Sequence, residues 1–146
     1  MNILSRSFLL LAVLPLAGCL QDTASYAFPE KEHAITLVRN QTWFWQDTVE
    51  LAVMVIRLPQ CNGGMTIKDV PLDTRIALYK APDEYPEPLH LLKSGKRVFA
   101  VSTQSCRAQE FKETPPDMGV KLGTFRVVGK VFQFVAADPS GKPEEE

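Results

Sequence analysis

Short runs of β-branched and aromatic residues, separated by proline and glycine turns, most strongly limit the folds open to this chain. β-branched and aromatic side chains fit the pleated surface of a sheet, and Gly, Pro and Asn supply the turns between strands. No segment repeats its apolar residues at helical spacing. The pattern predicts an all-β domain, a single small antiparallel sandwich or barrel of about eight short strands. The runs cover residues 34–39, 43–46, 49–58, 65–70, 75–80, 89–92, 97–102, 120–128 and 131–137.

The longest apolar run, residues 49–58 (VELAVMVIRL), is the segment whose length would also suit a helix. Its apolar residues are continuous and rich in Val, so we expect a strand that is buried on both faces. Residues 60–64 (QCNGG) should form the following turn, because Asn-Gly and Gly-Gly tolerate positive φ. Residues 65–70 would then return as the antiparallel partner. Residues 80–88 contain three prolines and are expected to form a surface loop.

The first residues have the parts of a secretory signal, namely a positive charge, an apolar run and a small-residue cleavage site. Arg6 supplies the charge, residues 8–16 the apolar run, and Ala17 and Gly18 the small residues. A permanent membrane span needs roughly 17–25 apolar residues, so this run is too short to be one. We therefore expect residues 1–18 to be a cleaved signal peptide and leave them out of the fold.

The sequence Leu16-Ala17-Gly18-Cys19 resembles the lipobox of bacterial lipoproteins. The resemblance covers only the start of the chain. It implies that Cys19 carries a diacylglyceryl group on its sulfur, becomes the mature N-terminus and is acylated on the new amine. Two or more acyl chains, such as palmitate, make membrane attachment stable. An ordinary cleavage site followed by a chance cysteine is the alternative.

The residue after Cys19 is Leu20 rather than Asp. In Gram-negative lipoproteins this implies sorting to the outer membrane. The resemblance therefore implies a protein held by its N-terminal lipid in the inner leaflet of that membrane, with its domain in the periplasm.

The two remaining cysteines, Cys61 and Cys106, are expected to form a disulfide. An exported protein lies in an oxidising compartment, where an even pair of cysteines is best read as a bridge. Closing a loop of this length stabilises a fold by roughly 4 kcal/mol in the chain-entropy model. A metal or redox site is the alternative, but neither cysteine has a Cys-x-x-Cys partner or a nearby His.

A mature chain that begins at Cys19 divides by composition into three parts. Residues 19–33 are mostly small and polar, and we expect them to carry the lipid and form a flexible tether spanning on the order of 20 Å. Residues 34–137 hold the strand pattern and are expected to form one β-domain. Residues 138–146 (DPSGKPEEE) are expected to be a disordered acidic tail.

Charge and motif spacing argue against several function classes. The chain has 16 Lys and Arg against 17 Asp and Glu without a basic block, which argues against nucleic-acid binding. His33 and His90 belong to no metal-ligand spacing. Ser94, Ser102 and Ser105 lack the Gly-x-Ser-x-Gly context of a hydrolase nucleophile. We therefore predict no catalytic residue, no metal ligand and no cofactor.

Four carboxylates, Asp69, Asp73, Glu84 and Glu87, lie in or beside the expected turns. Paired carboxylates can transfer protons or hold a hard cation. No loop offers the dense oxygen ligands of a calcium site, so we expect these side chains to be solvated loop charges.

Trp43-Phe44-Trp45 is the distinctive aromatic cluster of the chain. In a strand, Trp43 and Trp45 would share one face and Phe44 would take the other. If the tryptophans point inward they are core residues, which is the favoured alternative. If they point outward, Trp43 and Trp45 mark a binding surface.

These observations predict a non-enzymatic envelope lipoprotein whose β-domain binds an unidentified envelope protein. An inhibitor, immunity or assembly-accessory role is possible for such a domain by analogy alone. A carrier of an apolar molecule is the alternative, with residues 49–58 and 131–137 lining a barrel cavity. An envelope enzyme ranks third, because its acids, serines and His90 would have to converge from separate loops.

Overall fold

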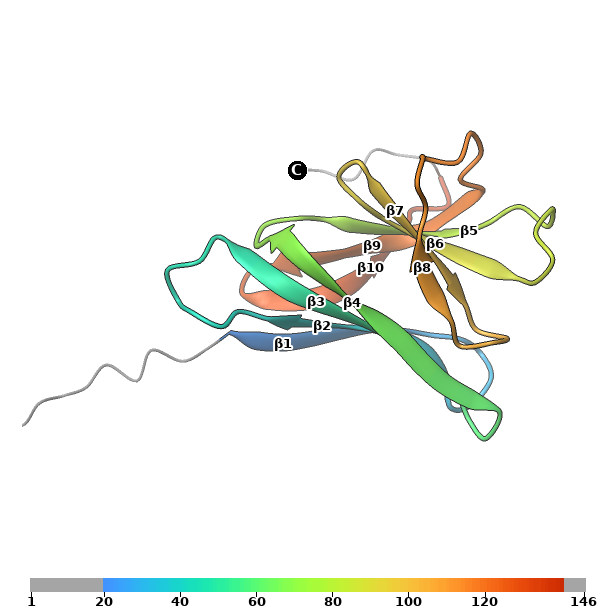
Figure 1. The fold of residues 1–146 in the computed structure, drawn as a ribbon, viewed down its shortest axis with the longest axis horizontal. Helices are drawn as coiled ribbons and strands as arrows, with labels where there is room; N and C mark the ends of the chain where they lie inside the picture. The colour runs from blue at the N-terminus through green and yellow to red at the C-terminus, as the bar shows by residue number, and fades with distance from the viewer. Residues whose placement is uncertain (1–19, 141–146) are drawn as a thin grey trace, which may run out of the picture.

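The computed structural model describes residues 20–140, and this part of the chain forms ten strands and no helix (Figure 1). The prediction of an all-β antiparallel domain is confirmed. The strands form two sheets that face each other as a sandwich and do not close into one barrel. The expected signal peptide at residues 1–18, the lipidation site Cys19 and most of the expected tail, residues 141–146, lie outside the described residues.

The first sheet contains the first four strands in chain order, and every neighbouring pair is antiparallel. They are β1 (Gln21–Ala27), β2 (His33–Asn40), β3 (Thr48–Arg57) and β4 (Cys61–Pro71). The second sheet has the order β10-β9-β5-β6-β7-β8. Its strands are β5 (Ile76–Lys80), β6 (Leu89–Ser94), β7 (Arg97–Ser102), β8 (Ala108–Glu110), β9 (Val120–Val128) and β10 (Val131–Ala136).

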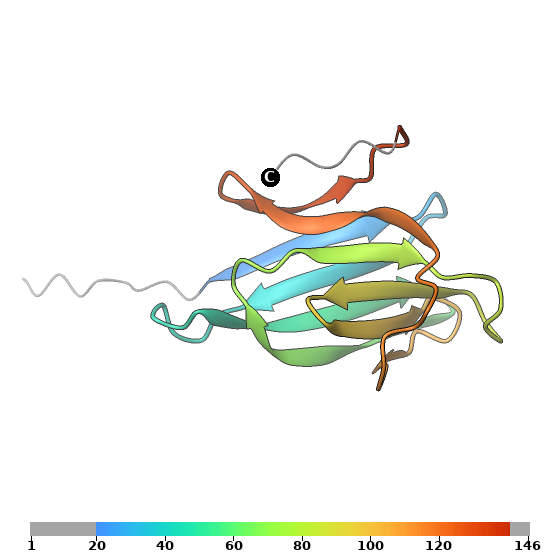
Figure 2. The same ribbon diagram turned by 90° about the horizontal axis from the view of Figure 1, so that it is seen from above.

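The sandwich has two ends, because antiparallel strands alternate in direction and their connections alternate accordingly. We call the end where β1 begins the amino end. Figure 2 shows it on the left, where it also carries the β2–β3, β4–β5, β6–β7 and β9–β10 connections. The opposite end, called the far end, carries the β1–β2, β3–β4, β5–β6 and β7–β8 connections.

The core lies between the two sheets and is built from alternate residues of the strands. In β3, Val49, Leu51, Val53 and Val55 are buried, while the outward Met54 is exposed. The prediction that residues 49–58 are buried on both faces is therefore wrong, because no segment within residues 20–140 covers the outer face of β3. The inner face is filled by packed side chains, so these positions line a core and not an open barrel cavity.

Strands β6 and β7 are the ones with two buried faces. A second cluster on the outer face of their sheet contains Leu91, Val98 and Ala100. Tyr85 of the β5–β6 connection and Phe111, just after β8, pack against this cluster. Connecting loops therefore supply the cover that β3 lacks.

The flexible tether predicted for residues 19–33 is also wrong, because Gln21–Ala27 form strand β1. Every residue of β1 is paired with β2, from Gln21 opposite Asn40 to Ala27 opposite Ala34. Ala24 is buried, and its neighbours Thr23 and Ser25 are exposed. The polar composition of this segment is that of an edge strand with one solvated face. The folded domain accordingly begins before residue 34.

The predicted disulfide between Cys61 and Cys106 is confirmed, with 5.9 Å between the two Cα atoms. Cys61 begins β4 and Cys106 lies in the β7–β8 connection, so the bridge joins an edge of one sheet to the other sheet at the far end. Gly63 permits this approach: a Cβ on it would lie 2.3 Å from the carbonyl oxygen of Cys106. The turn expected at residues 60–64 in fact lies at residues 58–60, and Gly63 belongs to β4.

Candidate functional site

The aromatic cluster forms the tip of the β2–β3 connection and is exposed. Trp43 is 53 %, Phe44 63 % and Trp45 65 % accessible. The two indole rings stack with 5.0 Å between centroids and 14° between planes, and Phe44 meets Trp45 edge-on at 4.9 Å. The strand predicted at residues 43–46 is absent, and the alternative that placed the tryptophans in the core is wrong. Phe44 joins them on the same surface, which the expected strand geometry did not predict.

Hydrogen bonds within the loop account for the absence of a strand. The buried Gln41 side chain donates its Nε2 proton to the carbonyl oxygen of Gln46 at 2.5 Å. The backbone N–H of Gln46 donates to the carbonyl of Trp43 at 3.0 Å, and the N–H of Trp43 donates to the Gln46 side-chain oxygen at 3.2 Å. These bonds close a compact turn that holds the rings at the surface. We call residues 41–47 the aromatic loop.

The aromatic loop lies beside the first described residue of the chain. The backbone N–H of Gln41 donates to the carbonyl oxygen of Leu20 at 2.9 Å. Cys19 is the residue immediately before Leu20, so any group attached to Cys19 is joined to the chain next to this loop. The exposed rings therefore lie at the end of the sandwich where the described part of the chain begins.

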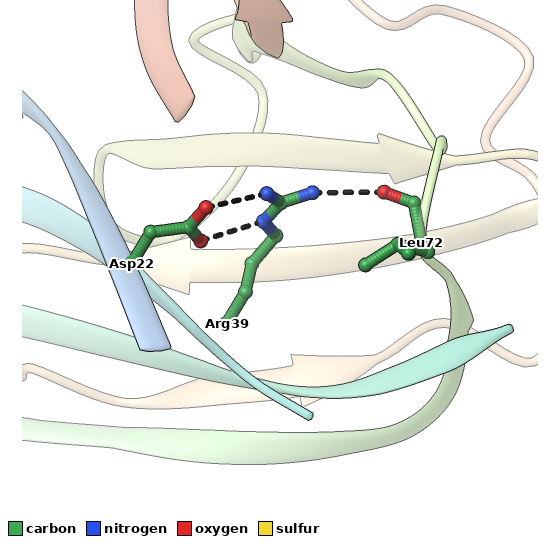
Figure 3. Close-up of polar contacts among 3 residues, drawn as sticks. All are labelled: Asp22, Arg39 and Leu72. Carbon is green, nitrogen blue, oxygen red and sulfur yellow. Dashed lines mark hydrogen bonds and ion pairs between the residues drawn. The ribbon is translucent and has the colours of Figure 1, made fainter. Parts of the chain in front are cut away.

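A buried arginine ties β1 to the rest of the amino end (Figure 3). Arg39 is 4 % exposed and donates from Nε and Nη2 to the two carboxylate oxygens of Asp22, at 2.8 and 2.6 Å. Its Nη1 donates to the carbonyl oxygen of Leu72 at 2.8 Å, and its guanidinium lies 4.2 Å from the ring centroid of Phe132. Bidentate pairing suits the planar guanidinium, which here has partners in β1, in the β4–β5 connection and in β10.

Arg39 is not among the functional residues predicted from the sequence, although its position carries a signal. Ile35, Leu37 and Arg39 alternate along β2 and therefore share the inward face. A charged residue at an inward position requires a partner, because an unpaired buried charge is costly. Asp22 supplies that partner from a segment that we expected to be a tether.

Two histidines and a phenylalanine pack together at the far end. His33 stacks on Phe28 with 3.9 Å between ring centroids, and His90 meets the same ring edge-on at 4.9 Å. His33 Nε2 and His90 Nδ1 are buried without a hydrogen-bond partner within residues 20–140. Burial, and after it the charges of His33 and Lys80, lower the pKa of His90 from 6.5 to about 4. His90 is therefore a neutral packed side chain at pH 7.

An open cleft of about 390 Å³ lies over the outer face of the second sheet at the far end. Tyr85, Glu87, Arg107 and Phe111 are among the side chains that line it. It lies between the β5–β6 connection and the segment around β8, and it combines aromatic surface with both signs of charge. Among the clefts formed by residues 20–140, this one has the lining that best resembles a protein-binding site.

Glu87 is fixed in this cleft and is not the solvated charge that we expected. Its Oε2 accepts a hydrogen bond from Ser102 Oγ at 2.7 Å, and its Oε1 accepts one from Ser105 Oγ at 3.2 Å. Ser102 Oγ in turn accepts the backbone N–H groups of Gln104 and Ser105, both at 3.1 Å. The network joins the β5–β6 and β7–β8 connections and so holds the cleft wall in place.

The described residues contain no group of three or more His, Cys, Asp or Glu side chains placed to hold a metal ion. No helix in residues 20–140 is long and apolar enough to cross a membrane. No family model, curated protein or solved structure matches the chain.

Proposed function

We propose that this chain is a lipid-anchored lipoprotein of the bacterial envelope whose β-sandwich binds another protein without catalysing a reaction. The lipobox resemblance at Leu16–Cys19 supports the anchor and the outer-membrane address. The start of β1 at Gln21 supports a short connection between lipid and domain. In this arrangement the sandwich is held close to the periplasmic surface of the membrane.

The far-end cleft carries the proposal for the binding site. Tyr85 and Phe111 supply aromatic surface, Arg107 a cation, and Glu87 a carboxylate that is already oriented by two hydroxyl groups. Aromatic and arginine side chains provide much of the binding energy at protein interfaces, and a fixed wall lowers the entropy lost on association. The cleft also lies away from the amino end, where the proposed lipid would be.

The anchor is tested by the intact mass of the protein extracted from a bacterial host that processes lipoproteins. We expect a chain that begins at Cys19 and carries the additional mass of acyl groups. A Cys19→Ser variant is the matched control, because it retains the fold and loses the attachment site. Wild-type protein with the mass of the polypeptide alone would reject the anchor.

The cleft is tested by crosslinking and affinity capture from envelopes of the native host, with wild type and variants compared side by side. Tyr85→Ala and Arg107→Glu should each reduce recovery of the partner by about tenfold or more, as truncations of central interface residues do. Arg57→Glu, a charge reversal at an exposed residue of β3 outside the cleft, is the control and should retain the partner. Equal recovery with all three variants would contradict the assignment of the cleft.

A further inference from the structure

Exposed apolar side chains gather at the amino end. Among residues 20–140, nine large hydrophobic side chains are exposed, and six of them lie on the aromatic loop or at the tip of the β9–β10 hairpin. Soluble domains expose single apolar residues commonly, whereas a cluster at one end marks a contact surface. We call these six residues the amino-end apolar surface: Trp43, Phe44, Trp45, Val127, Val128 and Val131.

The aromatic loop and the hairpin tip lie at the same end of the two sheets. Asp47, at the end of the aromatic loop, and Val127 line one shallow depression together with Leu72 and Asp73 of the β4–β5 connection. Figure 1 and Figure 2 both place the β2–β3 and β9–β10 connections on the side where β1 begins. The six side chains therefore belong to one end of the molecule, although the two loops lie far apart in sequence.

The chain leaves the described domain at this surface. Leu20 is hydrogen-bonded to Gln41 of the aromatic loop, and consecutive Cα atoms lie about 3.8 Å apart, so Cys19 follows within one residue of the loop's base. An acyl chain on Cys19 would have to enter the bilayer here. Because β1 is paired from Gln21 onward, no long tether separates that entry point from the rings.

We propose that the Trp43-Phe44-Trp45 tip docks into the headgroup region of the phospholipid bilayer that holds the Cys19 lipid. This inference rests on the anchor in the proposed function. Indole rings favour the membrane–water interface because they combine a large apolar surface with a polar N–H group, and the Phe44 ring adds apolar area. The loop thereby fixes the orientation of the sandwich and directs the far end toward the periplasm.

Charge around the surface favours a general phospholipid interface over recognition of an anionic headgroup. Lys130 at the hairpin tip, Arg75 in the β4–β5 connection and Lys96 in the β6–β7 connection are exposed cations. Asp47 and Asp73 are exposed anions at the same end. The signs nearly cancel, so the apolar rings and not net charge provide the attraction.

Intrinsic fluorescence tests the docking directly, because the chain contains only two tryptophans and both lie in this loop. The acylated protein is reconstituted into phosphatidylethanolamine–phosphatidylglycerol vesicles, with and without phospholipids brominated on their acyl chains. We expect the emission maximum to lie at shorter wavelength than that of the non-acylated protein in buffer without detergent. We also expect the brominated lipids to quench the emission. Tryptophans that keep a water-like emission and escape quenching would overturn the proposal.

A tryptophan moved to the far end provides the matched control. Leu58 is 44 % exposed in the β3–β4 turn, so Leu58→Trp in a Trp43→Phe, Trp45→Phe background places one indole at the opposite end on the same acylated chain. Its emission should remain unquenched. Equal quenching at both ends would mean that the sandwich has no fixed orientation. A wild-type spectrum that responds to an envelope protein but not to lipid would assign the loop to that protein. Either result would overturn the proposal.

Intact mass and vesicle flotation of the same preparation separate the two possible failures. A protein without acyl mass that does not float with the vesicles rejects the anchor. An acylated protein that floats but has unquenched tryptophans rejects the docking of the loop and leaves the anchor in place.

Discussion

The two ends of the sandwich are held together by different chemistry. At the amino end, an ion pair between the buried Arg39 and the partly exposed Asp22 joins β1 to the core. At the far end, the disulfide between Cys61 and Cys106 joins the two sheets, and the longer connections carry the cleft. The domain therefore fixes its first strand by a polar contact at the edge of the core, and it joins its two sheets at the far end by a covalent bond.

Breaking the amino-end ion pair should have the largest effect on stability. Arg39→Met removes three hydrogen bonds made by a charged group, two to the partly exposed Asp22 carboxylate and one to the Leu72 carbonyl, and we expect the free energy of unfolding to fall by about 3–5 kcal/mol. Urea denaturation at pH 7 measures the loss. Arg57→Met, at an exposed position, should change it by less than about 0.5 kcal/mol. An Arg39→Met protein as stable as wild type would show that the ion pair does not hold this end.

Removing the far-end bridge should have the next largest effect. Cys61→Ala with Cys106→Ala should lower the free energy of unfolding by about 2–4 kcal/mol, because the unfolded chain regains the freedom that a crosslink across 45 residues removes. Wild-type protein unfolded in the presence of a reductant should match the double variant. An unchanged denaturation midpoint in both samples would contradict this account of the far end.

Acidification should destabilise the far end through His90. Its pKa is about 4 in the folded state, below its ordinary 6.5, so the unfolded chain binds the proton more tightly. The stabilisation is complete above pH 6.5 and is lost as the pH falls toward 4. Between pH 7 and 4.5 the free energy of unfolding of wild type should fall by about 2 kcal/mol more than that of His90→Leu. Parallel pH profiles for the two proteins would refute the assignment.

Changing the aromatic loop should have the smallest effect on stability. Phe44 is 63 % exposed and its ring meets that of Trp45 edge-on, so Phe44→Ser should alter the free energy of unfolding by less than about 0.5 kcal/mol. Thermal unfolding of the two proteins measures the difference. A loss of unfolding free energy as large as that of the Cys61 and Cys106 double variant would mean that the Phe44 ring supports the fold. Contact with a membrane would then not be needed to explain why the ring is exposed.

The sequence predicted the parts of the fold that depend on local pattern. Runs such as residues 97–102 form strands because β-branched side chains favour the pleated surface whatever lies beyond them. The bridge between Cys61 and Cys106 was predicted from the oxidising compartment of an exported protein and from the even number of remaining cysteines, and it is present. Neither feature depends on which strands lie side by side.

The features that the sequence did not reveal depend on contacts between distant segments. Strand β1 has little apolar pattern and is fixed by pairing with β2 and by the contact from Asp22 to Arg39. Whether the outer face of a strand is buried depends on loops elsewhere in the chain, as the contrast between exposed Met54 and buried Val98 shows. Glu87 finds its two hydroxyl partners only after the β5–β6 connection has folded over β7.

The placement of β1 has a mechanical consequence. A force applied at Leu20 acts along the axis of β1, whose seven residues are all paired with β2. The backbone hydrogen bonds of that ladder are therefore loaded together in shear instead of opening one after another from an end. Asp22, held by Arg39, lies at the loaded end of the strand and adds a charged link where the strain would be greatest.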